Sequence, residues 1–304
     1  SGGRARSAKK GRTVLRKDKV AVFELIEKNR SGRNVSQLCK LYGVTTGGFY
    51  AWSKRPVSQH RQHDLRLIEA IREFHHGFRR AYGAPRMHHV LREQLLSCSV
   101  RRVNRLMKEA GIKASTTGLY IWRPGIQEFY SCAGNHLAES ETATGSGEQW
   151  AGDFTHIHTG AGWLYLAVVI DLYCRKVVGW SFSRSRNTHL TKRALQMAIA
   201  NQAIKPGCLF HSDQGVEYTA YEYRDELEAA GMTRSMSRKG TPLDNAAVES
   251  FFHTLKAELV HQHTFCDQIE ATAHIVAYIE FYNRERIHTS LNFQSPMEYE
   301  KLCA

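Results

Sequence analysis

Apolar residues recur at helical spacing through the first third of the chain. The segment KDKVAVFELIEKN has the pattern of an amphipathic helix. The segment NVSQLCKLYGVTTGGFYAWSKRP predicts a short helix, a turn at Gly43, and a second helix that Thr45 or Thr46 can cap and that Pro56 ends. After a basic flexible tail at residues 1–15, we therefore expect a helix-turn-helix DNA-binding unit over residues 16–58.

A second helical pattern follows over residues 59–113. Its segments are DLRLIEAIREFHHGF, then YGAPRMHHVLREQL, whose Pro85 suits the first turn of a helix, and then SVRRVNRLMKEAG. Ser99 can cap the last of these helices and Gly111 can end it. We interpret this region as a second helical DNA-binding unit.

The periodicity fades over residues 114–146, which we interpret as a linker, and then changes to that of strands. Three strand-like segments follow, QWAGDFTHIHT, WLYLAVVIDLY and KVVGWSFS, and the middle one is almost continuously apolar. Helix and strand patterns then alternate, which predicts a mixed sheet with flanking helices over residues 147–262. Residues 263–304 predict a C-terminal helical extension that packs on this core. The expected fold is multidomain, all-α helix-turn-helix units followed by an α/β core.

Charge divides the chain in the same way as the hydrophobic pattern. Residues 1–113 hold 26 Lys and Arg against 8 Asp and Glu, whereas residues 114–304 hold 16 against 21. A basic front half suits binding to nucleic acid phosphates. No run of 18 apolar residues occurs, so no membrane span is expected. The seven cysteines are scattered singly, which disfavours a zinc finger or a disulfide framework and favours a reducing, cytoplasmic location.

Basic and aromatic residues on the predicted helices are the candidate DNA contacts. In the helix after Ser99, the basic residues spread around an apolar face, as in a helix lying on DNA. An ordinary solvated basic face is the alternative. The candidates are Tyr50, Lys54, Arg86, Arg101, Arg102, Arg105 and Lys108.

Three carboxylates are the candidate catalytic residues and metal ligands. Asp153 lies in a predicted strand, Asp213 follows another strand, and Glu249 lies on a helix at the border of its apolar stripe. Three such groups can converge on a pair of divalent cations that hold the attacking and leaving oxygens of a phosphodiester displacement. Oxygen ligands suit Mg²⁺ or Mn²⁺, two ions per site.

Residues near the three carboxylates receive other assignments. Strand alternation turns His156 and His158 away from Asp153, so they are not counted as ligands. His211 is a weak candidate for supporting Asp213. Lys256 lies seven residues after Glu249 and projects from the same side of the helix, where it is expected to contact DNA.

Further polar residues are given structural roles or left open. Asp171 is interpreted as a strand-end charge, Glu217 as a loop charge and Asp244 as a helix cap, a role that Asn245 could also fill. The segment from Asn283 to His288 could contact DNA or pack against the core, and the sequence does not decide between them.

The chain resembles transposases of bacterial insertion sequences whose catalytic core is similar to retroviral integrases. The resemblance is carried by WAGDFTHIHTGAGWLYLAVVIDLYCRKVVGWS, HSDQGVEY, SRKGTPLDNAAVESFFHTLKAE and YIEFYNRERIHTSLNFQSPMEY, and by the basic helical segment RRAYGAPRMHHVLREQLLSCSVRRVNRLMKEAGIKA. It implies a ribonuclease-H-like core, an Asp, Asp, Glu triad at Asp153, Asp213 and Glu249, and cleavage followed by strand transfer. One departure is His156, which stands where the family has an aromatic residue.

The predicted function is a Mg-dependent DNA transposase acting on the terminal repeats of its element and on target DNA. The expected partners are double-stranded DNA and further copies of the chain, as a homodimer or higher assembly. The expected location is the bacterial cytoplasm, with the nucleoid. Two alternatives remain: a transposase-derived DNA-binding regulator, and a ribonuclease-H-like nuclease that cuts without joining.

Overall fold

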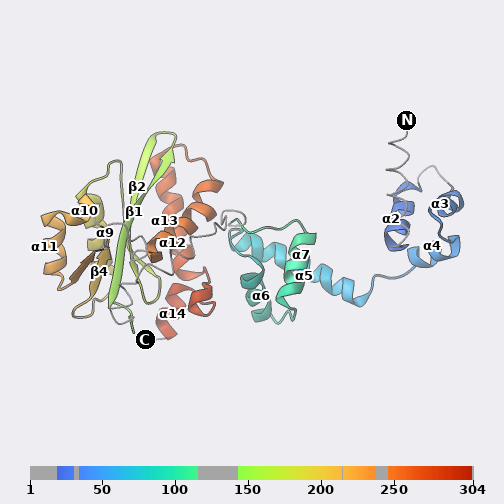
Figure 1. The fold of residues 1–304 in the computed structure, drawn as a ribbon, viewed down its shortest axis with the longest axis horizontal. Coiled ribbons are helices and arrows are strands. Elements are labelled where there is room, and N and C mark those ends of the chain that lie inside the picture. Colours follow the sequence, from blue (N-terminus) through green and yellow to red (C-terminus); the bar gives the residue numbers. More distant parts are fainter. Residues whose placement is uncertain (1–18, 31–33, 116–142, 214, 237–245, 303–304) are drawn as a thin grey trace, which may run out of the picture. The chain divides into compact units, whose positions relative to one another are not determined.

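The computed structural model describes residues 19–30, 34–115, 143–213, 215–236 and 246–302. The chain divides into two compact units, Ser1–Arg66 and Leu67–Ala304, and each is described by itself (Figure 1). The predicted basic tail, most of the predicted linker and the proposed caps Asp244 and Asn245 lie outside the described residues.

The first unit contains the three helices expected from the apolar spacing, α2 (Lys19–Asn29), α3 (Val35–Tyr42) and α4 (Thr46–Ser53). Gly43 ends α3 in the left-handed conformation with φ 70°, which glycine adopts without steric cost. Thr45 caps α4 by accepting a hydrogen bond from Gly48 N at 3.1 Å. The helices enclose a small core made of Val22, Phe23, Ile26, Leu38, Cys39 and Phe49. The predicted helix–turn–helix order is confirmed in the described residues.

The next three helices are α5 (Gln59–Gly77), α6 (Ala84–Glu93) and α7 (Val100–Glu109). Ser99 caps α7 through a hydrogen bond from Arg102 N, as predicted. Within the second unit, these helices pack on the segment that follows α13 (Gln268–Arg284). Tyr82 is fully buried, and its hydroxyl accepts from Ile287 N at 2.9 Å and lies 3.2 Å from Glu285 O. Within the second unit, the segment from α5 to α7 is therefore anchored to residues near 286.

A mixed sheet lies at the centre of the second unit, with five strands among the described residues. The strands are β1 (Gln149–Thr159), β2 (Gly162–Asp171), β3 (Val177–Ser183), β4 (Leu209–Ser212) and β5 (Thr233–Met236). Their order is β3-β2-β1-β4-β5. The β3-β2-β1 portion is antiparallel, whereas β4 and β5 run parallel to β1. The predicted mixed sheet is confirmed.

Helices cover both faces of the sheet (Figure 1). On one face α9 (Thr188–Asn201) and α11 (Tyr221–Ala229), preceded by the short α10 (Val216–Thr219), pack on a core that includes Trp150 and Phe210. On the other face α12 (Ala246–Glu258) and α13 pack on a core that includes Ala151 and Ile157. The chain continues through the short turns η3 (Val260–Gln262) and η4 (Thr289–Leu291) to α14 (Pro296–Leu302).

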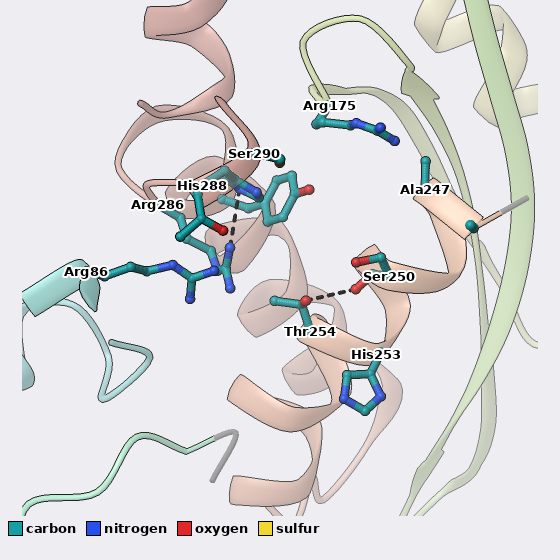
Figure 2. Close-up of a pocket in the computed structure, with 12 residues that line it drawn as sticks. Arg86, Arg175, Ala247, Ser250, His253, Thr254, Arg286, His288 and Ser290 are labelled. Carbon is teal, nitrogen blue, oxygen red and sulfur yellow. Dashed lines mark hydrogen bonds between the residues drawn. The ribbon is translucent and has the colours of Figure 1, made fainter. Parts of the chain in front are cut away.

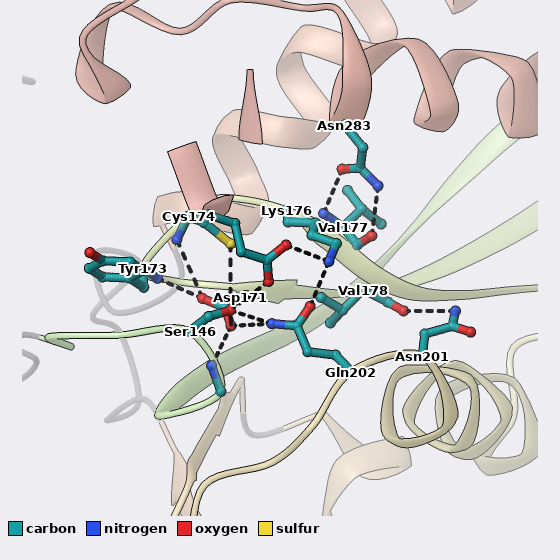
Figure 3. Close-up of polar contacts among 12 residues, drawn as sticks. Ser146, Asp171, Tyr173, Cys174, Lys176, Val177, Val178, Asn201, Gln202 and Asn283 are labelled. Carbon is teal, nitrogen blue, oxygen red and sulfur yellow. Dashed lines mark hydrogen bonds and ion pairs between the residues drawn. The ribbon is translucent and has the colours of Figure 1, made fainter. Parts of the chain in front are cut away.

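Buried polar contacts tie the C-terminal helices to the sheet, as part of Figure 3 shows. The Asn283 side chain accepts from Val177 N and donates to Val177 O, both at 2.9 Å. Arg286 donates from Nε and Nη2 to the two carboxylate oxygens of Glu258 at 2.9 and 2.7 Å. Asn283 and Arg286 therefore pack against the core. For these two residues the structure decides between core packing and DNA contact, which the sequence left open.

Asp171 lies at the end of β2 and is fully buried. It accepts hydrogen bonds from Gly147 N, Trp150 Nε1, Tyr173 N and Gln202 Nε2 at 2.8 to 3.2 Å. Figure 3 shows the contacts with Tyr173 and Gln202. This dense set of donors makes Asp171 a structural carboxylate, as predicted from its place at a strand end.

Candidate active site

Asp153 lies in the middle of β1, on the strand face that turns toward α12. Its neighbours at the same pleat, Thr155 and Ile157, are buried. His156 and His158 are exposed and both pack edge-on against the ring of Trp163, at 5.1 and 5.0 Å between ring centroids. Side chains along β1 therefore alternate as predicted, with both histidines on the face opposite Asp153. His156 packs against the exposed Trp163.

Asp213 follows the last residue of β4. In the parallel pairing of β1 with β4, Gly152 lies opposite Ser212, so the next residues along the two strands are Asp153 and Asp213. Neighbouring strands lie about 4.8 Å apart, which brings the two aspartates to the same edge of the sheet. Asp213 Oδ1 accepts from Gly215 N at 2.9 Å, which fixes the carboxylate in the turn.

Glu249 is placed by the packing of α12. The apolar stripe of this helix, Val248, Phe251, Phe252 and Leu255, is buried on the sheet. Glu249 borders the stripe and is exposed, and Lys256 is half-buried almost two turns further on.

Electrostatics connects these four side chains. Burial, together with the charges of Asp213 and Glu249, raises the pKa of Asp153 to about 7. The Phe154 N–H, which donates to Asp153 Oδ1 at 2.7 Å, and the charge of Lys256 lower the same pKa. The end of β4 and the helix α12 therefore direct charged groups toward Asp153. Strongly perturbed carboxyls of this kind are concentrated at functional sites.

The donor chemistry at this edge suits a divalent cation, but the ligands are not drawn together. Burial and two like charges oppose ionisation of the Asp153 carboxyl, and a bound cation would stabilise its ionised form. Among the described residues, no three His, Cys, Asp or Glu side chains stand close enough together to hold a metal ion. Glu249, exposed at the start of α12, would have to turn inward.

A pair that the sequence did not reveal lies beside Asp213. Arg186 forms a double hydrogen bond with Glu217 through its Nε and Nη2, the second at 3.1 Å, and its guanidinium stands 4.7 Å from the centre of the Phe154 ring. The Glu217 hydrogen bond raises the pKa of Arg186, and the Asp213 charge adds to the effect. Glu217 is thus a buried ion-pair partner instead of the loop charge expected from the sequence. The two residues are 31 positions apart, so local spacing holds no signal for their contact.

The remaining candidates occupy different environments. Arg101, Arg105 and Lys108 are exposed on α7, where Arg105 also pairs with Glu109 at 3.4 Å. Arg102 on α7 is half-buried, and Tyr50 and Lys54 of the first unit are exposed. Arg86 is half-buried on α6 and lines a cavity. His211 is buried, with Nδ1 2.9 Å from Ser235 Oγ.

Comparisons with known proteins define the class first. An HTH-like domain matches residues 62–118, and two integrase core domain models match residues 143–242 and 230–296. The chain thus combines a helix-turn-helix-like segment with an integrase core. No helix in the described ranges is long and apolar enough to cross a membrane.

Curated relatives define the family. The chain is 36% identical over 249 residues to "Transposase for insertion sequence element IS904" of Lactococcus lactis, covering 82% of this chain and 98% of the relative. It is 34% identical over 285 residues to "Transposase InsF for insertion sequence IS3A" of Escherichia coli, covering 91% and 98%. The chain belongs to the family of insertion-sequence transposases with an integrase core.

A solved structure similar to this chain is the catalytic core domain of BIV integrase. It is 18% identical with a TM-score of 0.42, covering 51% of this chain and 95% of that structure. A likeness at this score adds nothing to the family assignment, which comes from the sequence relatives.

Proposed function

We propose that this chain is a DNA transposase that binds the ends of its mobile element and catalyses metal-dependent DNA cleavage and strand transfer. The observation that carries the proposal is the environment of Asp153. Its pKa is raised by burial and by the charges of Asp213 and Glu249, so two further carboxylates act on this one. A fold that needed only stability would pair or remove such charges.

Asp153, Asp213 and Glu249 are the residues that would hold two Mg²⁺ or Mn²⁺ ions. Such ions polarise phosphate oxygens and lower the pKa of bound hydroxyl groups. The Phe154 and Gly215 backbone N–H groups orient the two aspartates through the bonds at 2.7 and 2.9 Å. The Glu217–Arg186 pair stands behind Asp213 and positions the turn that holds it.

Different basic residues would contact different parts of the DNA. Lys256 lies on the Glu249 side of α12 and would hold a phosphate at the rim of the site. Arg86, Arg101, Arg102, Arg105 and Lys108, with Tyr50 and Lys54, would bind the duplex outside the triad. We propose that the chain acts as a homodimer or higher assembly on element ends and target DNA. An enzyme with this substrate works in the bacterial cytoplasm, on the nucleoid.

The test is a joining assay with the element's own end DNA, both intact and pre-cut, in the presence of Mg²⁺. Asp153→Asn, Asp213→Asn and Glu249→Gln keep side-chain size and remove charge. Each is expected to lower cleavage and joining by about a hundredfold or more, as loss of one group that stabilises transition-state charge does. Binding of the end DNA should remain, because the DNA-binding helices are untouched.

Glu222→Gln is the matched control, since Glu222 is an exposed carboxylate on α11 and should be dispensable. Full joining by a triad variant would remove that residue from the site. A wild-type chain that cuts but never joins the pre-cut end would instead be a nuclease, and one that only binds would be a regulator.

A further inference from the structure

A cavity of about 420 Å³ lies on the side of α12 that faces away from the sheet. Figure 2 shows its walls: Ser250 and His253 from α12, Arg86 from α6, Arg175 from the turn between β2 and β3, and Arg286 and His288 from the segment after α13. Four separate parts of the second unit thus contribute to one cavity.

The cavity carries more positive charge than its walls neutralise. Arg286 is held by Glu258, which uses both carboxylate oxygens for this guanidinium. Arg175 forms no hydrogen bond or ion pair with any described residue. Arg86 has its Nε buried without a hydrogen-bond partner among the described residues. Two guanidinium groups therefore lie at the cavity with their charge unpaired.

The positive charges of Arg86, Arg175 and Arg286 all act on His288. His288 lies between them, and its Nε2 is 3.3 Å from Arg286 Nη1. Burial lowers the pKa of His288 to about 2, and the charges of Arg286, Arg86 and Arg175 contribute to that lowering. Like charges kept together in a partly buried space are costly, and a bound anion would relieve this cost.

The geometry of Arg175 is consistent with a binding role. Its backbone is in the left-handed region with φ 62°, which a residue with a side chain adopts at a cost. Strained positions of this kind are concentrated at ligand sites. Nothing in the local packing requires an arginine there, because its guanidinium has no partner among the described residues.

The other donors at the cavity suit phosphate. Hydroxyl groups line it from α12 and from η4, at Ser250, Thr254, Thr289 and Ser290. Thr254 donates to Ser250 O at 2.8 Å. The remaining hydroxyls, with planar guanidinium groups that donate two parallel hydrogen bonds, are the usual ligands of phosphate oxygens.

The position of the cavity on α12 relates it to the candidate active site. Successive residues turn by roughly 100° around a helix, so His253 is about 40° from Glu249, and Ser250 follows Glu249 directly. Glu249 therefore borders the buried stripe on one side and the cavity face on the other. A strand with its scissile phosphate at Glu249 can reach the cavity without leaving the surface of α12.

We propose that this cavity binds a backbone phosphodiester of the DNA strand that enters the active site, with Arg175 and Arg86 as its principal ligands. The phosphate chemistry follows from the cavity itself, whereas its assignment to DNA rests on the proposed function. Arg86 becomes a residue that holds DNA next to the cut, joined by Arg175, which sequence reasoning did not select.

The experiment measures binding of the full chain to end DNA over a range of salt concentrations. Arg175→Gln and Arg86→Gln are each expected to weaken binding about tenfold, the loss expected for one charge-assisted hydrogen-bonding group. The slope of log K against log salt should become shallower by about 0.9 for each phosphate that the variant no longer neutralises. Arg224→Gln on α11 removes the same charge from an exposed arginine paired with Glu228, and should leave both quantities unchanged.

Arg175→Gly separates binding from folding. Glycine accepts a φ of 62° without strain, so this variant should melt no lower than the wild type and still bind DNA about tenfold more weakly. The phosphates near the cut can also be replaced one at a time by neutral methylphosphonates. At one position this replacement should weaken DNA binding by the wild type but not by Arg175→Gln.

Two results would overturn the proposal. One is an Arg175→Gln or Arg175→Gly chain that matches the Arg224→Gln control in affinity and salt slope. The other is a case in which pyrophosphate stabilises the wild type but not Arg175→Gln, while Arg175→Gln binds DNA as tightly as the wild type. That result would make the cavity a site for a free anion. In either case wild-type joining activity stands, so failure of this inference is distinguishable from failure of the proposed function.

Discussion

Two aspartates of the same sheet, Asp171 fully buried and Asp153 partly buried, show how environment separates a structural carboxylate from a candidate catalytic one. Asp171 accepts hydrogen bonds from several backbone and side-chain donors, which satisfy its carboxylate. Asp153 accepts one among the described residues, from Phe154 N, and its pKa is raised to about 7 by burial and by like charges. A satisfied carboxylate holds a fold together, whereas an unsatisfied one is available to a ligand.

Lys256 is the residue outside the triad whose removal should alter the reaction most directly. Its charge lowers the pKa of Asp153, so the ammonium lies within electrostatic reach of the site. We expect Lys256→Ala to reduce cleavage about tenfold, in line with loss of one charged hydrogen bond to a phosphate, and Lys256→Arg to recover most of it. The measurement is cleavage rate, with crosslinking from position 256 to the bases near the cut.

Lys192→Ala is the control for Lys256, because Lys192 lies on α9 and is engaged by Glu226 at 2.9 Å. Undiminished joining by Lys256→Ala, together with no crosslink near the cut, would return Lys256 to the ordinary surface lysines.

At the scale of elements, the sequence predicted what is determined locally. The Thr45 and Ser99 caps, the Gly43 turn and the five strands follow from residue types within a few positions of one another. The contacts that join elements could not be predicted in this way. Arg186 with Glu217 and Asn283 with Val177 depend on side chains that meet only after the sheet has formed. The cavity at Arg175 likewise depends on elements that are distant in sequence, so it could not be predicted from local residue patterns.

The contact between β3 and α9 leads to a prediction at this scale. A Cβ added at Gly179 would stand 2.2 Å from Ala194 O and 2.6 Å from Ala198 N, both backbone atoms that cannot turn aside. Gly179→Ala should therefore destabilise the second unit by about 1–3 kcal/mol, as overpacking does. Gly77→Ala, where a Cβ meets nothing within 4 Å, should be neutral or stabilising. Denaturant unfolding of both variants is the measurement, and equal midpoints would contradict the close approach.

At the scale of the whole molecule, the two helical regions differ in how they depend on the core. The first unit closes its own small core between Val22 and Phe49. Helices α5 to α7 share their core with the C-terminal part of the second unit, since Ile287 belongs to that core and the Ile287 N–H donates to the Tyr82 hydroxyl. A fragment ending near residue 113 would expose this shared surface.

We therefore predict that residues 1–58 fold and bind DNA when separated from the rest. This fragment holds 14 Lys and Arg against 3 Asp and Glu, so binding should weaken with salt at a slope of about −0.9 per phosphate neutralised. Circular dichroism and a salt titration are the measurements. Phe49→Ala, which costs about 3–5 kcal/mol at a fully buried aromatic, should abolish both folding and binding. A folded fragment without affinity for DNA would contradict the assignment.

The contacts between the sheet and the C-terminal helices have a consequence for biosynthesis. The Val177 N–H donates a hydrogen bond to Asn283, which is synthesised 106 residues later. The Ser146 hydroxyl donates to Glu300, which is synthesised 154 residues later. Ribosomes release the N-terminal helices first, so a nascent chain can fold its first unit long before its sheet is complete. A product that stops before α13 would still contain Asp153, Asp213 and Glu249, but not the residues that brace their sheet. On the proposed function, such a product would occupy DNA without reacting, so prematurely terminated translation would restrain the mobility of the element that encodes it.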